Sequence, residues 1–201
     1  MSKKIFIVYG HHDIKKSFNA CVRDTFIEEA KKLGHQVDLI NLHEENPIPF
    51  FDGSGPNDQI LDYRKRLEKS DVMFIISPCH NLRLTSITES FVDWILHPRW
   101  FFQYKSLIPG NKYFQNYGYS QPNAMKGKLG IIGLTYGGPM IAYSNFSFFD
   151  NIPYRRIKKS VFNLGGMKCR YFRVYSVLPN MEKKVFDKHM ERVRKLARDL
   201  K

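Results

Sequence analysis

Short apolar runs alternate with helical segments along this chain, and this alternation limits the available folds more than any other feature. Residues 4–9, 71–77 and 128–136 are rich in apolar side chains, as is typical of parallel strands that are covered on both faces. Residues 36–42 and 168–177 are predicted to be two further strands. The chain therefore supplies five strands.

Helices are predicted between these strands. The first begins at a Ser17 or Asn19 cap and ends before Gly34. Others are expected at about 58–69, 87–96 and 152–164, and an apolar stripe predicts a last helix at about 181–200. Five strands that alternate with helices predict right-handed crossovers and a parallel sheet with helices on both faces. The two common strand orders, Rossmann-like and flavodoxin-like, both fit this pattern.

The 201 residues are expected to form one domain, 1–201, because no linker or internal repeat divides them. An irregular excursion is expected at about 97–126. Segments of this length without clear secondary structure are usually functional or interfacial, and the alternative is an Ω-loop packed on the monomer's own core. Its aromatic side chains are Trp100, Phe101, Phe102, Tyr104, Tyr113, Phe114, Tyr117 and Tyr119.

The net charge of +13 is concentrated near the carboxyl terminus, where residues 155–201 hold fifteen Lys or Arg and four acids. Such a region suits nucleic acid, anionic lipid or a phosphate-bearing cofactor, or is simply a solvated basic face. No nucleic-acid motif accompanies the charge, so we expect no nucleic-acid partner.

Cysteine usage and the apolar segments indicate the compartment. Three widely spaced cysteines fit neither a disulfide framework nor a zinc cluster, so no metal site is expected. We expect a reducing, cytoplasmic location. No segment has the apolar length of a membrane span, and residues 5–9 suit a buried strand better than a signal peptide.

Ligands of open α/β sheets bind beyond the carboxyl ends of the strands. The loop after the first strand, residues 10–19, leads into a helix whose N-terminal amides favour an anion, and His12, Ser17 and Asn19 offer side-chain donors. The alternative is that Ser17 and Asn19 are ordinary helix caps. The loop matches neither a Walker sequence nor GxGxxG, which disfavours a Rossmann dinucleotide site.

Two further loops belong to the same sheet edge. Residues 77–82 follow the third strand, and residues 135–139 follow the fourth, with Tyr143 soon after. Consecutive glycines such as Gly137 and Gly138 allow the backbone to approach a flat ligand, although a tight turn also explains them. Three such loops at one edge predict a single crevice.

The chain resembles the flavodoxin-like NAD(P)H:quinone oxidoreductases of the DT-diaphorase type, which include regulatory flavoproteins of potassium efflux systems. The resemblance begins with His12, Ser17, Phe18 and Asn19, which match the family pattern H-x4-S-[FL]-N. It continues through Gly34 and His35, the segment 71–96, the segment 129–138 and Tyr143.

This resemblance implies a flavodoxin-like three-layer sandwich with a five-stranded sheet in the order 2-1-3-4-5. It implies an enzyme that binds FMN or FAD, uses NAD(P)H as co-substrate and transfers hydride to quinones or related aromatic acceptors, as a homodimer. The resemblance implies that Tyr143 is catalytic, and the alternative is an aromatic residue of the dimer interface. His80 is a second catalytic candidate because it could shuttle a proton at the expected flavin wall, and the alternative is a polar loop residue. The cofactor-binding residues are expected to be His12, Ser17, Phe18, Asn19, Pro78, Cys79, His80, Asn81, Leu82, Thr135, Tyr136, Gly137 and Gly138.

Several positions depart from the family pattern. His80 and Asn81 stand where a Trp is usual, Arg64 stands where many members have Gln, and Phe149 replaces the usual His partner of Tyr143. Thr85, Ser86 and Glu89 replace Pro, Ala and Lys. These changes motivate an alternative function, a non-enzymatic flavodoxin-like module that regulates a transporter or another partner.

Overall fold

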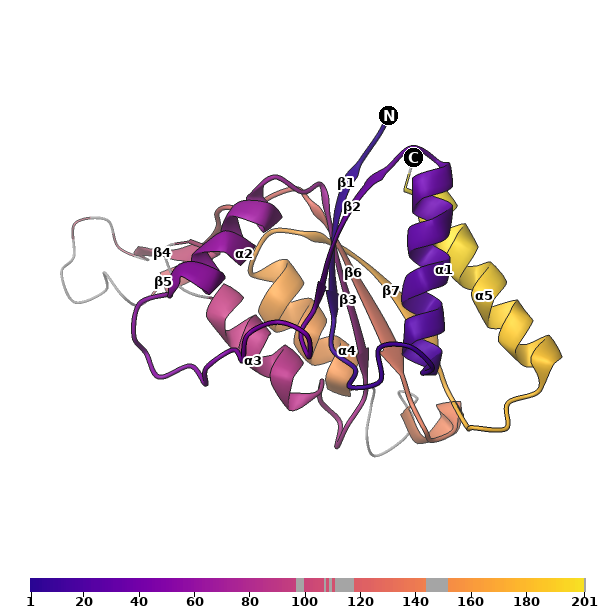
Figure 1. Ribbon diagram of the computed structural model, residues 1–201. Coiled ribbons are helices and arrows are strands. Elements are labelled where there is room, and N and C mark those ends of the chain that lie inside the picture. The colour runs from indigo at the N-terminus through magenta and orange to yellow at the C-terminus, as the bar shows by residue number, and fades with distance from the viewer. Residues whose placement is uncertain (97–99, 107, 109, 111–117, 144–151, 201) are drawn as a thin grey trace.

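A parallel five-stranded sheet forms the centre of the molecule (Figure 1). The computed structural model describes residues 1–96, 100–106, 108, 110, 118–143 and 152–200. The strand order is β2-β1-β3-β6-β7, and every neighbouring pair is parallel. This order is the flavodoxin-like 2-1-3-4-5 order, so the expected fold is confirmed. The strands are β1 (Lys4–Tyr9), β2 (Gln36–Asn41), β3 (Val72–Pro78), β6 (Leu129–Thr135) and β7 (Lys168–Val174).

Helices cover both faces of the sheet. Figure 1 shows α1 (Phe18–Lys32) and α5 (Lys183–Arg198) side by side on one face. The other face carries α2 (Asp58–Glu68), α3 (Ser86–Ile95) and α4 (Ile152–Ile157), and α4 continues as a π-helical stretch, η3 (Lys158–Asn163). The result is a three-layer sandwich.

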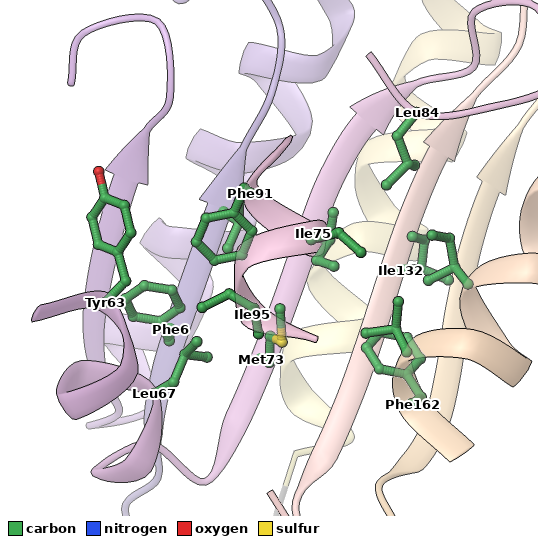
Figure 2. Packing of buried hydrophobic residues seen from close by; sticks show 14 of the residues in the cluster. Phe6, Tyr63, Leu67, Met73, Ile75, Leu84, Phe91, Ile95, Ile132 and Phe162 are labelled. Atoms are coloured by element: carbon green, nitrogen blue, oxygen red, sulfur yellow. The ribbon is translucent and has the colours of Figure 1, made fainter. Parts of the chain in front are cut away.

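Each face of the sheet has its own hydrophobic core. Phe26 of α1 meets Phe74 of β3 edge-on, with the ring centroids 4.7 Å apart, in the core beneath α1 and α5. Both neighbours of Ile75 in β3 are also buried, which explains the nearly continuous apolar run of a doubly covered strand. Figure 2 shows the core beneath α2 and α3, with Phe6, Tyr63, Leu67, Met73, Ile75, Leu84, Phe91, Ile95, Ile132 and Phe162.

Helix ends follow the sequence signals. Ser17 caps α1 by accepting a hydrogen bond from the Ala20 amide at 3.1 Å. Asn57 caps α2 in the same way through the Ile60 amide at 2.9 Å. Gly34 follows α1 with a φ of +79°, a left-handed conformation that favours glycine. These caps fix where each helix leaves the edge of the sheet.

The excursion at 97–126 differs from its sequence-based expectation. Two of its segments, β4 (Phe102–Ser106) and β5 (Gly118–Pro122), form an antiparallel pair and are not irregular. The sequence of β4 alternates aromatic and polar residues, whereas β5 begins with Gly118 and ends with Pro122 and lacks such a pattern, so cross-strand pairing determines the conformation of β5. Tyr113, Phe114 and Tyr117 lie outside the described residues.

The fifth sheet strand is shorter than expected. It ends at Val174 because Ser176 has a φ of 53° and donates its amide to the Gly138 carbonyl at 2.9 Å. The last helix then begins at Lys183. None of the described helices combines the length and the apolar composition that crossing a membrane requires.

Candidate functional site

Three turns meet at the carboxyl ends of β1, β3 and β6. The Gly10 amide donates to the Ile76 carbonyl at 2.9 Å, which holds the first turn against β3. The Cys79 amide donates to the Thr135 carbonyl at 2.8 Å, which holds the turn after β3 against β6. The three loops predicted from the sequence therefore form one continuous edge, as the parallel topology requires.

Internal hydrogen bonds fix the conformation of the turn after β1. The Ser17 hydroxyl donates to the Asp13 carbonyl at 2.7 Å and lies 2.8 Å from the Tyr9 hydroxyl. Arg23 donates to the Ile14 carbonyl at 2.8 Å. These contacts leave the amides of Phe18 and Asn19, in the first turn of α1, without a hydrogen-bond partner among the described residues. Such amides attract an anion at the positive end of a helix dipole.

Asn19 is buried and joins this turn to β6. Its side-chain nitrogen donates to the Thr135 hydroxyl at 2.9 Å, and that hydroxyl donates back to the Asn19 carbonyl oxygen at 3.2 Å. The two residues satisfy each other inside the protein. Their side chains therefore fix the spacing between two loops.

A tight, left-handed turn follows β3. The His80 amide donates to the Arg83 carbonyl at 2.9 Å, and the Arg83 amide donates back at 3.0 Å. Between them, Asn81 and Leu82 have φ values of 48° and 61°. Positive φ is tolerated by Asn but is costly for Leu, and such backbone strain is concentrated at functional sites.

Cys79 lies at the base of this turn. Its sulfur accepts a hydrogen bond from the Leu82 amide, and burial raises the pKa of the thiol to about 11. The thiol is therefore uncharged near neutral pH and serves as an apolar wall. The amide of Asn81 has no hydrogen-bond partner within the described part of the chain, so it is available to a ligand.

The turn after β6 is lined by tyrosines. The Tyr136 ring is buried and contacts both Tyr143 and Tyr175, with centroid distances of 4.5 and 4.8 Å. Tyr143 closes η2 (Met140–Tyr143) and lies over Gly138, where a β-carbon would come within 3.2 Å of the Tyr143 hydroxyl. Burial raises the pKa of both Tyr136 and Tyr143, so both phenols keep their protons.

A hollow of about 430 Å³ lies between the turns after β3 and β6, lined by Cys79, Asn81, Leu82 and Tyr143. Its volume is in the range of small-molecule sites. Beside it, a β-carbon added to Gly137 would meet no atom of the described residues within 4 Å, so this backbone is open toward a ligand. The amides of Gly137 and Gly138 have no hydrogen-bond partner among the described residues. The geometry suits a flat ligand with polar atoms along one edge.

The other expected site residues take varied positions. His12 is exposed and stacks on His11, with centroids 4.4 Å apart. The Phe18 ring turns away from the hollow, toward Phe186 and His189 of α5. Pro78 is buried as the last residue of β3, and His80 is exposed at the rim of its turn. Phe149 lies outside the described residues.

Two of the residues that depart from the family pattern have structural partners. The Arg156 guanidinium pairs with the Glu89 carboxylate at 2.6 Å, and Glu89 also accepts the Leu84 amide at 3.0 Å. Buried Arg64 donates to the Trp94 carbonyl at 2.7 Å and lies 5.2 Å from the Trp100 ring. Within the described residues, no group of three or more His, Cys, Asp or Glu is arranged to hold a metal ion.

Sequence reasoning missed two supports of this edge. Thr85 donates its hydroxyl to the Gly10 carbonyl at 2.8 Å and lies 2.7 Å from the Thr88 hydroxyl. Tyr9, the last residue of β1, holds the Asp13 carbonyl through its hydroxyl at 2.8 Å. Tyr9 ends an otherwise apolar strand with a hydroxyl group, and this feature of the sequence could have indicated its role at the edge of the sheet.

Taken with its strand order, this edge defines a doubly wound α/β protein of the flavodoxin-like class, with the turn after β1 and the hollow between the turns after β3 and β6 at the same edge of the sheet. Residues 3–197 match the model of the family described as Flavodoxin-like fold, and the chain belongs to that family.

Two curated relatives are similar over most of the chain. Ribosyldihydronicotinamide dehydrogenase (quinone) of Mus musculus is 25% identical over 167 residues, which are 71% of this chain and 67% of the relative. The protein of the same name from Homo sapiens is 22% identical over the same shares of both chains.

Solved structures share the fold over nearly full length. NAD(P)H:quinone oxidoreductase from Methanothermobacter marburgensis has a TM-score of 0.81 at 13% identity and covers 100% of both chains. An FMN-dependent NADH-azoreductase from Bacillus anthracis, in complex with FMN, has a TM-score of 0.76 at 18% identity and covers 98% of this chain and 99% of its own.

Proposed function

We propose that this chain is a flavin-dependent NAD(P)H oxidoreductase that transfers hydride by way of the flavin to quinones or related aromatic acceptors. The observation that carries the proposal is the hollow between the turns after β3 and β6, with unpartnered amides along its rim and Tyr143 in its wall. Membership of the flavodoxin-like family and the names of its relatives support the same activity.

The residues present fit a flavin. The Phe18 and Asn19 amides and the exposed His12 would hold its phosphate, with Ser17 setting the conformation of the turn.

The hollow would hold the flavin ring. The amides of Asn81, Gly137 and Gly138 would meet the polar edge of the ring, and Cys79, Leu82 and Tyr143 would line the pocket around it. A bound flavin supplies the two-electron chemistry, accepting hydride from NAD(P)H and passing it to an acceptor. We propose FMN or FAD as the cofactor, and two structural neighbours are complexes with FMN.

Tyr143 is the proposed hydrogen-bond donor of the site. Its phenol stays protonated because burial raises its pKa. A neutral donor at the wall of the hollow stabilises negative charge that develops on the bound ring system during hydride transfer. We propose His80, which is exposed at the rim, as the residue that would pass a proton from solvent to the reduced acceptor.

The remaining features of the proposal are a small-molecule acceptor, a homodimer and a cytoplasmic location. The dimer proposal draws on the family resemblance, and the location draws on cysteine usage. The three cysteines are free in the structure.

Stepwise mixing without oxygen tests the activity. Protein loaded with FMN or FAD is mixed with NADH or NADPH and then with a water-soluble quinone, while the flavin absorbance is recorded. We expect loss of the oxidised flavin band on the first addition and its return on the second. A flavin-loaded protein that neither nicotinamide nucleotide reduces would favour the regulatory module over the enzyme.

A further inference from the structure

One end of the molecule, beyond β6 and β7, exposes four large apolar side chains. Their exposed fractions are 65% for Met140, 76% for Ile141, 54% for Leu178 and 41% for Val185. We call these four residues the apolar patch.

The segments that carry the apolar patch adjoin one another. Ser176 donates to the Gly138 carbonyl at 2.9 Å, and the Tyr143 and Tyr175 rings lie 5.9 Å apart. Figure 1 shows η2 beside the chain that leads into α5, at the lower right. The four side chains therefore belong to one end of the molecule, next to the hollow that Tyr143 lines.

Lysines accompany the apolar patch. Lys183, Lys184 and Lys188 are exposed in the first turns of α5, and exposed Lys16 lines, with Leu178, a second hollow of about 370 Å³. None of these lysines has an ion-pair partner within the described residues.

The local charge is positive. The acids in the same turns of α5 are Glu182 and Asp187, while residues 153–181 hold seven Lys or Arg and no acid. Lysines beside exposed aliphatic side chains are the composition that binds anionic bilayers.

We infer that the apolar patch and its lysines dock the protein on an anionic lipid bilayer. The aliphatic side chains enter the interface while the ammonium groups meet lipid phosphates. A second copy of the chain fits less well, because an isologous contact would face two positive surfaces toward each other. Nucleic acid would neutralise the lysines but leave four apolar side chains in water.

The biological consequence rests on the proposed function. Many quinones are lipophilic, and η2 carries both the apolar patch and Tyr143. Docking at this end brings the hollow to the bilayer surface, so acceptors dissolved in the lipid become substrates. Binding itself needs neither flavin nor acceptor.

Co-sedimentation with lipid vesicles tests the docking. The purified full chain is mixed with vesicles of phosphatidylcholine alone, or of phosphatidylcholine with phosphatidylglycerol, at low and at high salt. We expect sedimentation with the anionic vesicles at low salt and much less at high salt, because salt screens the lysines. Absence of sedimentation with anionic vesicles at low salt overturns the inference.

Paired variants locate the surface. The double variant Lys183→Glu with Lys184→Glu is expected to lower the partition of the protein onto anionic vesicles at least about 25-fold. Each lysine near an anionic surface contributes about fivefold to this partition. Leu178→Ser with Val185→Ser is expected to lower it about tenfold. The matched control is Lys69→Glu with Lys126→Glu, which changes the same charge at the amino-end edge of the sheet. The docking surface is overturned if the control and the Lys183/Lys184 variant lose vesicle binding equally. It is also overturned if the Leu178/Val185 variant binds vesicles as well as the wild type.

Each failure has a distinct meaning. Because vesicle binding does not require flavin, a negative result with normal flavin chemistry removes the docking and leaves the proposed function intact. Vesicle binding by a chain that takes up no flavin removes the proposed function and leaves the docking intact. A third outcome is that the chain binds single-stranded DNA strongly and in a salt-dependent way, loses this binding in the Lys183/Lys184 variant, and does not bind vesicles. This outcome assigns the surface to nucleic acid and overturns the inference.

Discussion

Asn19 and Thr135 lie 116 residues apart and hold each other by two reciprocal hydrogen bonds of 2.9 and 3.2 Å. Asn19 is the second residue of α1 and Thr135 is the last residue of β6, so the pair sets the distance between the turn after β1 and the turn after β6. Both residues are buried, with exposed fractions of 3% and 5%, so water competes little for their hydrogen bonds.

Thr135→Val is expected to loosen this edge. The substitution keeps the shape but leaves the buried Asn19 amide unpartnered, which lowers the free energy of unfolding by about 1–3 kcal/mol. Flavin affinity is expected to fall as well, because the two loops lose their fixed spacing. Urea unfolding and a flavin titration measure the two effects. Thr25→Val is the control, since the Thr25 hydroxyl donates to the weakly accepting Met190 sulfur at 3.4 Å. Unchanged affinity and stability in Thr135→Val would contradict the assigned role.

Gly137→Ala separates ligand binding from stability. The new methyl group meets no protein atom within 4 Å, so the free energy of unfolding is expected to change by less than about 0.5 kcal/mol. A flavin seated against this backbone would meet the methyl group, and its affinity is expected to fall about tenfold, or about 1.4 kcal/mol. Gly55→Ala is the matched control, because its methyl group also faces open space. Equal flavin affinities for the two variants would place the ring elsewhere.

Tyr143→Phe is expected to slow reduction without removing the cofactor. The ring that walls the hollow remains, while the hydrogen-bond donor is lost, and the loss of one such donor costs about 100-fold in rate. Rapid mixing with NAD(P)H gives the rate of flavin reduction. Tyr154→Phe serves as the control, since Tyr154 stacks on Tyr171 at 3.7 Å outside the lining of the hollow. A wild-type rate in Tyr143→Phe would remove Tyr143 from the chemistry.

Stability is expected to rise with pH near the ordinary titration range of histidine. His35 is buried, its Nδ1 accepts the Lys3 amide at 3.2 Å, and burial and then the nearby amino terminus lower its pKa. The unfolded chain therefore binds a proton that the folded chain excludes. The contribution is complete above about pH 6.5 and is lost as the pH falls through the lowered pKa.

Urea unfolding at several pH values measures this dependence. His35→Gln keeps an acceptor for the Lys3 amide and removes the titration, so its stability is expected to vary less with pH than that of the wild type. Burial lowers the pKa of His11 and His43 as well, so part of the slope remains. An identical slope in wild type and His35→Gln would contradict the assignment.

The strands and helices of the sandwich were predictable because their signals are local, whereas the strand order was an implication of the family resemblance. Apolar runs such as 71–77 mark doubly covered strands, and Ser17 and Gly34 mark the ends of α1. Parallel topology then places the three loops at one edge, so the neighbourhood of Tyr143 and Cys79 followed from the sequence.

The details of the site depend on long-range contacts that no local pattern encodes. The partnership of Asn19 with Thr135 joins opposite halves of the chain, and it turns a predicted donor into an internal link. The left-handed φ of Leu82 opposes the preference of leucine and is imposed by the paired His80 and Arg83. The β4 and β5 pair likewise arises from cross-strand bonding across the excursion.

A visible absorption titration of the purified chain with FMN and with FAD tests the central claim most directly. If the three turns hold a flavin ring, the oxidised flavin band shifts and gains structure on binding, and Gly137→Ala weakens this change while Gly55→Ala does not. A spectrum identical to that of free flavin, for both cofactors and at protein concentrations well above those added, would contradict a flavin site at this edge.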